Sequence, residues 1–317
     1  MTRLGAVPEA ALRTQFRTVG VRLRLAGLCF NLRTDIPAVI EHVLDMYIGH
    51  ELEVGAGIDD FRVHVSYTGP FRRFVRRRIQ VFIDGDTIIE PLPLRFACLA
   101  LEAALNACIN STASKLLLHA AVVERDGLAV ILPGPSGSGK STLCAALVMR
   151  GWRLLSDEHA MLHPADGRLQ PVGRPISLKN ESIALIRAWA SDPHFSAIFS
   201  NTSEGTIAYL RPPIDSVVRA TETVVPALIV SPTWRADVPV TLEPLGKSET
   251  FRRLAEDSMN YHTTQRFGFD TLAGLVDSCA TYRLWYGPLA PAVDAMEALA
   301  ARMRTERASS LSATATA

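Results

Sequence analysis

The chain has 317 residues, enough for one large hydrophobic core or two smaller ones. Apolar residues make up 48% and charged residues 21%, as is typical of soluble globular proteins. The formal net charge of +1 gives no support for a polyanionic partner, so we expect no nucleic-acid binding. The five cysteines are scattered and form no CxxC pair, which favours reduced thiols and argues against a zinc site.

No targeting or membrane-spanning segment is indicated either. Residues 1–20 include Arg3 and Glu9 and lack the continuous apolar run of a signal peptide. The most apolar helical run, 96–107, contains Glu102 and is too short to cross a bilayer. We therefore expect a cytoplasmic protein without membrane contact.

The first part of the chain, residues 1–112, predicts a small α+β region. An Asp84-Gly85 pair is typical of a tight hairpin turn. Apolar residues alternate with polar ones where strands are expected, and they recur at helical spacing where helices are expected. The expected strands cover 21–30, 61–67 and 74–83, and the expected helices cover 36–48 and 94–110.

A basic cluster lies within this first part. It consists of Arg72, Arg73, Arg76, Arg77 and Arg78. One interpretation is a solvated strand face; the other is a docking surface for an acidic peptide or protein, because guanidinium groups pair well with carboxylates and phosphates. The sequence leaves both open.

The most informative stretch is Leu128–Leu143. Five apolar residues at 128–132 predict a short buried strand, and an alanine-rich helical run covers 142–149. Between them lies the pattern Gly-x-x-x-x-Gly-Lys-Ser at 134–141. An apolar strand over 115–123 and the turn residues Asp126-Gly127 come before it, which predicts a hairpin.

A glycine-rich loop between a strand and a helix is the context in which a P-loop binds phosphate. Its backbone N–H groups and the helix N-terminus attract anions. Lys140 would reach the β- and γ-phosphates, and the Ser141 hydroxyl would ligate Mg²⁺. A turn that binds nothing is the alternative, but the full pattern favours a nucleoside triphosphate. The predicted nucleotide contacts are Gly134, Pro135, Ser136, Gly137, Ser138, Gly139, Lys140, Ser141 and Thr142.

Two acids, Asp157 and Glu158, follow the next apolar strand, 152–156. At a strand end they would stand at the rim of the sheet where the loop also opens. One carboxylate would hold Mg²⁺ through water while the other accepts the proton of an attacking hydroxyl. A solvated acid pair is the alternative. His119, in the strand before the loop, is either a core residue or a group near the phosphates, whereas His159 is expected at the surface.

The rest of the chain alternates strands and helices. Several strands are joined by short turns, which argues against a regular, parallel, doubly wound sheet. We expect a core over 113–305 and a disordered tail rich in Ser, Thr and Ala over 306–317. The expected helices cover 176–189, 248–259, 267–280 and 290–303, the expected strands 207–210, 223–231, 238–242 and 282–286, and 191–205 is a polar loop.

Several of these motifs together resemble the HPr kinase/phosphorylase family, in particular the branch called HprK-related kinase A. The ordered set of the glycine loop, RGWRLLSDE at 150–158 and LRPP at 210–213 is the most specific part. The resemblance also includes His119-Ala120-Ala121, Pro175–Glu181, Gly205–Pro213, Asn260-Tyr261 and Gly268-Phe269.

The resemblance implies an α/β fold. Its core would be of the HPr kinase and phosphoenolpyruvate carboxykinase type, a P-loop on a mixed, largely antiparallel sheet with flanking helices. It also implies a serine kinase, a phosphotransferase with an alcohol group as acceptor, that uses ATP and Mg²⁺. By the same resemblance Asp157 is the catalytic base, Glu158 replaces a second aspartate, and His119 lies near the transferred phosphate. Lys140 completes this set.

Arg211 is a further candidate, because an arginine in cis can contact the transferred phosphoryl group; pairing with an acid on the sheet surface is the equal alternative. The glycine-rich signature of the phosphorylase reaction is missing at 179–181. The resemblance therefore implies kinase activity without phosphorolysis.

The implied acceptor is a serine of a peptide or small protein, presented by a PqqD-like peptide-binding partner. A small-molecule kinase and a nucleotide-dependent regulatory module are the alternatives. The sequence leaves open the acceptor, the oligomeric state, the choice of ATP or GTP, and which of Asp157 and Glu158 contacts the metal.

Overall fold

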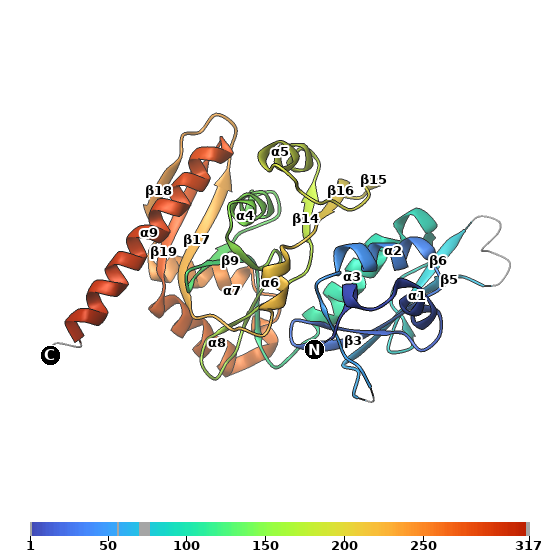
Figure 1. Cartoon of the computed structure of the whole chain (residues 1–317). Coiled ribbons are helices and arrows are strands. Elements are labelled where there is room, and N and C mark those ends of the chain that lie inside the picture. Colours follow the sequence, from blue (N-terminus) through green and yellow to red (C-terminus); the bar gives the residue numbers. More distant parts are fainter. Residues whose placement is uncertain (1, 56, 70–76, 315–317) are drawn as a thin grey trace. The chain divides into compact units, whose positions relative to one another are not determined.

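A computed structural model describes residues 2–55, 57–69 and 77–314. The chain is mixed α/β, with mixed sheets and flanking helices (Figure 1). It divides into two compact units: the first combines Met1–Thr112 with Pro171–Arg187 and Asp192–Thr221, and the second holds Ala113–Gln170, Ala188–Ser191 and Glu222–Ala317. Most of the segment 171–221 thus groups with the N-terminal part, whereas the sequence-based division assigns it to the core over 113–305.

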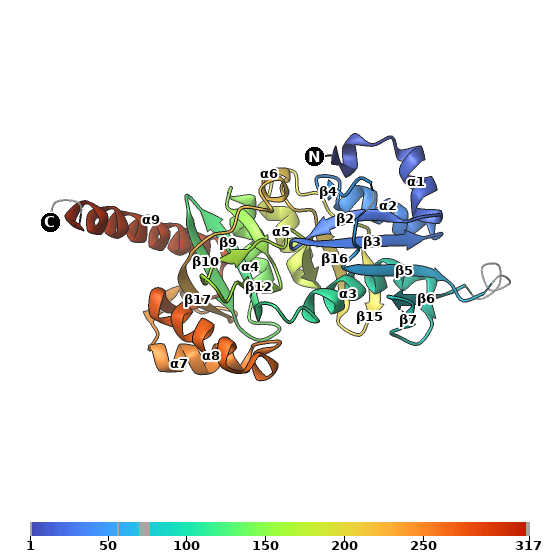
Figure 2. The same ribbon diagram turned by 90° about the horizontal axis from the view of Figure 1, so that it is seen from below.

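The first unit contains a sheet of mostly antiparallel strands, in which β3 and β5 are the parallel pair (Figure 2). Helix α3 (Ala97–Asn110) packs on β5 and β6, and α1 (Glu9–Arg17) contacts β3 and α2 (Pro37–Met46). In spatial order the strands are β1 (Thr2–Arg3), β4 (Glu51–Leu52), β2 (Val21–Leu25), β3 (Leu28–Thr34), β5 (Phe61–Tyr67), β6 (Arg78–Ile83) and β7 (Asp86–Thr87), with β8 (Leu92–Pro93) beside β6.

Local turns decide where these strands end. The expected single strand over 21–30 is a hairpin, because Ala26 and Gly27 both take positive φ angles, 55° and 79°. Alanine rarely adopts that conformation, so Ala26-Gly27 is a weaker turn signal than Asn-Gly or Asp-Gly. The turn predicted at Asp84-Gly85 is confirmed, with φ angles of 53° and 96°.

Of the basic cluster, Arg72, Arg73 and Arg76 lie outside the described residues. The guanidinium group of Arg78 donates to the Pro91 carbonyl oxygen, and this contact holds β6 against the loop before β8.

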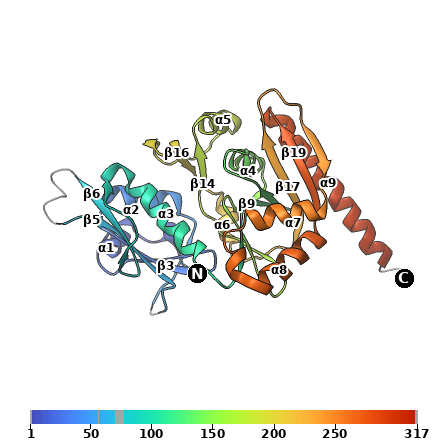
Figure 3. The same ribbon diagram turned by 180° about the vertical axis from the view of Figure 1, so that it is seen from behind.

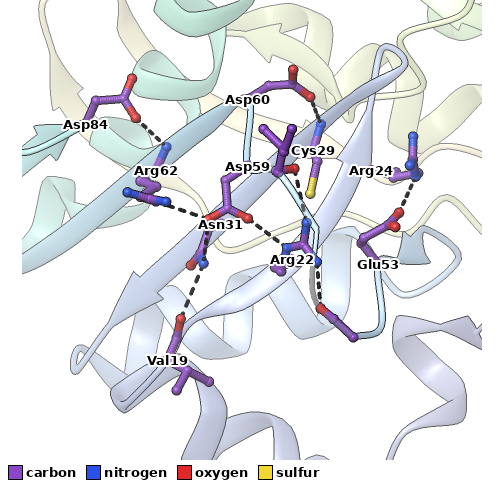
Figure 4. A network of polar contacts seen from close by, with 12 residues as sticks. Val19, Arg22, Arg24, Cys29, Asn31, Glu53, Asp59, Asp60, Arg62 and Asp84 are labelled. Carbon is purple, nitrogen blue, oxygen red and sulfur yellow. Dashed lines mark hydrogen bonds and ion pairs between the residues drawn. The ribbon is translucent and has the colours of Figure 1, made fainter.

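A polar network fixes the connection between β4 and β5 (Figure 4). The Arg22 guanidinium lies 2.7 Å from an Asp59 carboxylate oxygen and also donates to the carbonyl oxygens of Gly55 and Ile58. Burial alone would raise the pKa of Asp59, but hydrogen bonds from Arg62 and Arg22 hold it below its usual value. The network therefore holds Gly55, Ile58 and Asp59 against β2 and β3.

A second, three-stranded sheet also belongs to the first unit. It pairs β14 (Ile176–Lys179) with β16 (Gly205–Leu210), and β16 with β15 (Phe199–Thr202). The helix expected over 176–189 is therefore wrong in its first turn. Asn180 takes a φ of 52°, which turns the chain, and α5 begins only at Glu181 and ends at Trp189. Helix α6 (Ile214–Val218) follows β16.

A buried charge cluster ties this later segment to the N-terminal part. Glu102, on α3, is 1% exposed and lies 2.5 Å from the Arg174 guanidinium. His42 Nε2 lies 2.7 Å from Glu102 Oε1, and the Tyr47 hydroxyl donates to the same carboxylate. Burial would raise the pKa of Glu102, but Arg174 and His42 outweigh it and lower the pKa to about 2. His50 Nε2 adds a contact of 3.0 Å to the Gly173 carbonyl oxygen.

The second unit is built on one mixed sheet. Strands β10, β17 and β19 run parallel to one another, and the other pairings are antiparallel. In spatial order the strands are β13 (Leu169–Gln170), β12 (His159–Leu162), β9 (Leu116–Arg125), β10 (Leu128–Pro133), β17 (Pro226–Trp234), β19 (Ala280–Tyr286) and β18 (Thr241–Pro244), with β11 (Arg153–Ser156) also beside β9.

Helices cover both faces of this sheet. Helices α7 (Lys247–Glu256) and α8 (Tyr261–Ser278) bury apolar residues against Leu116, Leu118 and Ala120 of β9 (Figure 3). Helix α4 (Lys140–Met149) packs against β9, β10 and β11, and its buried residues are absent from that cluster. It therefore covers the opposite face, toward which Leu117, His119 and Ala121 alternate.

The last helix, α9 (Leu289–Thr314), packs on α4 and β19 and then continues past the sheet (Figure 1). It extends through most of 306–317, where the sequence predicts disorder. Arg304 and Asp126 form an ion pair that links this extension to the β9–β10 turn. Within the described part of the chain, no helix combines the length and apolar character needed to cross a membrane.

We predict that Arg174→Met lowers the free energy of unfolding by about 3 kcal/mol, because it leaves the Glu102 carboxylate buried without its guanidinium partner. Adding Glu102→Gln to the same chain should restore part of the loss. The control is Arg24→Met, which removes a pair with Glu53 whose side chains are 41% and 30% exposed and should cost less than about 1 kcal/mol. Urea unfolding of the full chain measures all three.

The same measurement as a function of pH separates the carboxylate from simple packing. The native pKa of Glu102 is lowered from 4.5 to about 2, so its contribution to stability is present above pH 4.5 and is lost as the pH falls through 2. Glu102→Gln should lack this part of the acid dependence, and an unchanged acid profile would contradict the assignment.

Candidate functional site

Strand β9 lies at the centre of the site because two sets of strands meet on it. On one edge Ala120 pairs with Pro133, the last residue of β10. On the other edge Val122 pairs with Ser156 of β11, and His119 pairs with His159 of β12. The register therefore sets the Asp157-Glu158 turn opposite Ala121 and Ala120. Loop and acids lie at the same level, two strand spacings or roughly 10 Å apart across the sheet.

The loop at 134–139, called the glycine loop below, turns from β10 into α4 through three glycines with positive φ. These are Gly134, Gly137 and Gly139, at 145°, 82° and 92°. The Lys140 ammonium folds back and donates to the carbonyl oxygens of Gly134 and Pro135. The Ser138 hydroxyl is buried and has no hydrogen-bond partner among the described residues. A positively charged group and an unsatisfied hydroxyl thus lie in a loop that glycine keeps open.

The parallel strands β17 and β19 support this loop from the side. The backbone N–H of Trp234 donates to the Ser138 carbonyl oxygen at 2.9 Å. The Tyr286 hydroxyl donates to the Gly139 carbonyl oxygen at 2.9 Å, and burial raises the pKa of that hydroxyl. A Cβ added at Gly139 would meet the Tyr286 oxygen at 2.1 Å, so the glycine is required by contact as well as by its φ.

The acid pair forms the turn between β11 and β12. The Ser156 hydroxyl accepts hydrogen bonds from the backbone N–H groups of Glu158 and His159, at 3.3 and 2.9 Å. Asp157 is 7% exposed, and Glu158 is half-buried. Burial raises the pKa of the Cys144 thiol on α4, and the charge of Asp157 raises it further. The Cys144 thiol also donates to the Ser156 carbonyl oxygen at 4.0 Å, so the end of β11 that carries Asp157 lies beside the first two turns of α4.

His119 lies on the same face of the sheet, half-buried, with His159 directly opposite it on β12. His159 is 2% exposed, so the expectation that it lies at the surface is wrong. It is buried because β12 is an inner strand, bordered by β9 and β13.

Asp257 is a site residue that the sequence does not indicate. Helix α7 ends at Glu256, and residues 257–259 then pair with β9: the His119 N–H donates to the Asp257 carbonyl oxygen at 3.1 Å. The last pair of β10 with β9 is Pro133 with Ala120; beyond it, residues 257–259 lie along the same edge of β9. The register puts the Asp257 and His119 side chains on one face. Burial raises the pKa of Asp257. The positive charges of His119 and Lys140 act to lower it, but the effect of burial is larger.

The sequence predicts a helix over 248–259 and gives no sign that Asp257 lies at the site, because the change from helix to strand depends on pairing with β9. The local signal that could have found it is Asn260, whose side chain holds the same segment through hydrogen bonds with Leu117 and Lys115.

Arg211 belongs to the first unit, whereas Lys140, Ser141, Asp157, Glu158 and His119 belong to the second. The Arg211 guanidinium lies 3.3 Å from Asp45, which also accepts a contact from His194 at 2.7 Å. This is the acid pairing that the sequence offers as the alternative role for Arg211.

The oxygen donors near the glycine loop suit a cation that is bound partly by the protein and partly by phosphate oxygens. Among the described residues, no group of three or more His, Cys, Asp and Glu side chains could hold a metal alone. Mg²⁺ commonly takes only one or two protein ligands and fills its shell with water and phosphate oxygens. Ser141 is the second residue of α4, three residues after Ser138, and the half-buried Glu158 adjoins Asp157 at the end of β11, so these oxygen donors are compatible with such an ion.

Comparison with models of protein families gives a match to part of the chain. A family model described as SynChlorMet cassette protein ScmC matches residues 95–169. That segment spans α3, the β9–β10 hairpin, the glycine loop, α4 and the acid turn, and it is less than half of the chain. None of the curated proteins compared with the chain matches it.

We predict that Gly139→Ala destabilises the second unit more than Gly137→Ala does. Both residues have positive φ, which costs an alanine about 1 kcal/mol, but a Cβ at Gly137 meets nothing within 4 Å whereas at Gly139 it meets Tyr286. The clash should add about 1–3 kcal/mol. Urea unfolding measures the difference, and adding Tyr286→Phe to Gly139→Ala should reduce it. Equal effects of the two alanines would show that the contact does not matter.

Proposed function

We propose that the chain is an ATP- and Mg²⁺-dependent kinase that transfers the γ-phosphoryl group to a serine hydroxyl of a peptide or small protein. Its core would be of the HPr kinase type, working without the reverse phosphorolysis. The observation that carries the proposal is the register of β9, which brings the glycine loop and Asp157 to one level of the sheet on the α4 face. A phosphate held by the loop would then have a carboxylate at the side from which an acceptor can approach.

In the proposed reaction the chain mainly binds and orients. The loop amides and Lys140 would hold the triphosphate and neutralise its charge. The serine oxygen forms a bond to the γ-phosphorus as the bond to the β–γ bridging oxygen breaks, and the Asp157 carboxylate takes the hydroxyl proton. Mg²⁺, held by Ser141 and Glu158, would neutralise the phosphate oxygens.

His119 and Asp257 are joined by a backbone hydrogen bond across β9, which puts their side chains on one face of the sheet. The charges of His119 and Lys140 both act on the Asp257 carboxylate, against the effect of its burial. We propose that Asp257 is a positioning residue that orients Lys140 and His119 through charge.

Mass spectrometry tests the acceptor class directly. Purified full-length protein with Mg²⁺ and ATP would be incubated with a serine-containing peptide pool and, in parallel, with a metabolite pool. Phosphoserine in peptides supports the proposal, whereas phosphorylated metabolites would favour a small-molecule kinase. Slow ATP hydrolysis without any acceptor would favour a regulatory module.

We expect Asp157→Asn to retain ATP affinity and to lower turnover by roughly three orders of magnitude, because the amide cannot accept the hydroxyl proton. Asp166→Asn, in the exposed turn after β12, is the control and should leave turnover unchanged. Calorimetric ATP titration and steady-state kinetics give the two quantities. Unchanged turnover in Asp157→Asn would remove the base assignment.

For Asp257→Asn we expect a decrease in kcat of about ten- to a hundredfold with little change in ATP affinity, since misplacing a charged group costs rate more than binding. The exposed Asp277→Asn is the matched control. A purely structural role would instead lower the unfolding midpoint and leave kcat per folded molecule intact.

A further inference from the structure

Beside the glycine loop, on the side away from the acids, strands β17 and β19 extend past the point where β10 ends. Ile131 pairs with Ile229, so the level of Pro133 corresponds to Ser231, and β17 continues for three more residues to Trp234. Tyr286 of β19 pairs with Trp234 at this outer end. The two strand ends form a wall along the loop, as the carboxyl ends of parallel strands do at many nucleotide sites.

Trp234 is a large aromatic side chain on this wall, and it is 45% exposed. Tryptophan is highly buried on average in folded proteins, so this exposure is unusual. The ring is fixed in place: its Nε1 donates to the Gly287 carbonyl oxygen at 3.1 Å, and its backbone N–H donates to Ser138 in the loop. The Trp234 Cβ lies 3.0 Å from the position of a Cβ at Gly139.

The backbone behind the ring is equally constrained. The Arg235 N–H donates to the Tyr286 carbonyl oxygen at 3.0 Å, and the Arg235 guanidinium stacks on Trp285 at 5.5 Å. A Cβ at Gly287 would meet the carbonyl oxygens of Arg235 and Val238 at 2.9 Å. The indole is thus held on a rigid support with part of its surface in solvent, which is the arrangement of a stacking platform rather than of a mobile surface group.

We infer that Trp234 stacks on the base of the bound nucleotide. This rests on the proposed function. In a P-loop the lysine contacts the β- and γ-phosphates. Here the Lys140 ammonium donates to the carbonyl oxygens of Gly134 and Pro135, directly after Pro133, which pairs with Ala120 of β9, so the γ end is expected toward β9. The α-phosphate, the ribose and the base then extend toward the other side of the loop, where β17 and β19 end. Every base offers a flat π-face to an aromatic ring, so this contact binds nucleotides without selecting ATP over GTP.

The test compares ATP with tripolyphosphate, which has the same phosphate chain and no base, in calorimetric titrations of the full chain with Mg²⁺. Trp234→Leu should weaken ATP binding about tenfold and leave tripolyphosphate binding unchanged, because base stacking is lost while the loop is intact. Trp234→Phe should restore most of the ATP affinity. Phe269→Leu, which replaces a 52% exposed aromatic on α8, is the control and should affect neither compound.

The outcomes separate the two proposals. An equal loss of ATP and tripolyphosphate affinity in Trp234→Leu would overturn stacking and make Trp234 a support of the loop; no loss of either would also overturn it. Wild-type protein that binds tripolyphosphate but not ATP would overturn the stacking site. Wild-type protein that binds neither compound would overturn the proposed function, and the stacking site with it.

Discussion

The pairing of β9 with its neighbours is the constraint on which the candidate site depends. This strand forms a hairpin with β10, accepts β11 and β12 on its other edge, and receives residues 257–259 where β10 leaves the sheet. The register of these pairings therefore fixes the positions of the glycine loop, the acid turn and Asp257 along β9 together. A slip of one residue would move His119 to the opposite face and separate these groups.

A second constraint decides which residues belong with which unit. Arg174 is buried against Glu102, and the isolated charge of either would be costly to bury, so the segment that carries Arg174 stays with α3. Three-stranded pairing of β14, β15 and β16 then brings Arg211 into the same unit, beside Asp45. The proposed catalytic groups that remain, from His119 to Glu158, occupy a stretch of the second unit that is nearly continuous in sequence.

The sequence predicts the parts of this molecule that depend on local signals. The hairpin at Asp126-Gly127 and the strand, loop and helix around Gly134–Ser141 follow from turn residues and apolar runs, and the structure has them. Contacts between distant segments carry no such signal. Residues 176–179 form a strand only because 207–210 lie beside them, and Asp257 leaves its helix only because β9 has a free edge there. The partner of Arg174 could not be predicted for the same reason.

The position of Lys140 bears on how the proposed triphosphate would enter. Its ammonium donates to two neutral carbonyl oxygens of the loop, and it is 6% exposed. A phosphate oxygen carries negative charge, so it attracts the ammonium more strongly than a neutral carbonyl oxygen does. Exchange of the carbonyl contacts for phosphate contacts would therefore be favourable, and most of the desolvation of the Lys140 side chain has already taken place in the protein without ligand. The space beside Gly137 is open, so under the proposed function the lysine that stabilises the loop without ligand would exchange these carbonyl contacts for contacts with the bound phosphate.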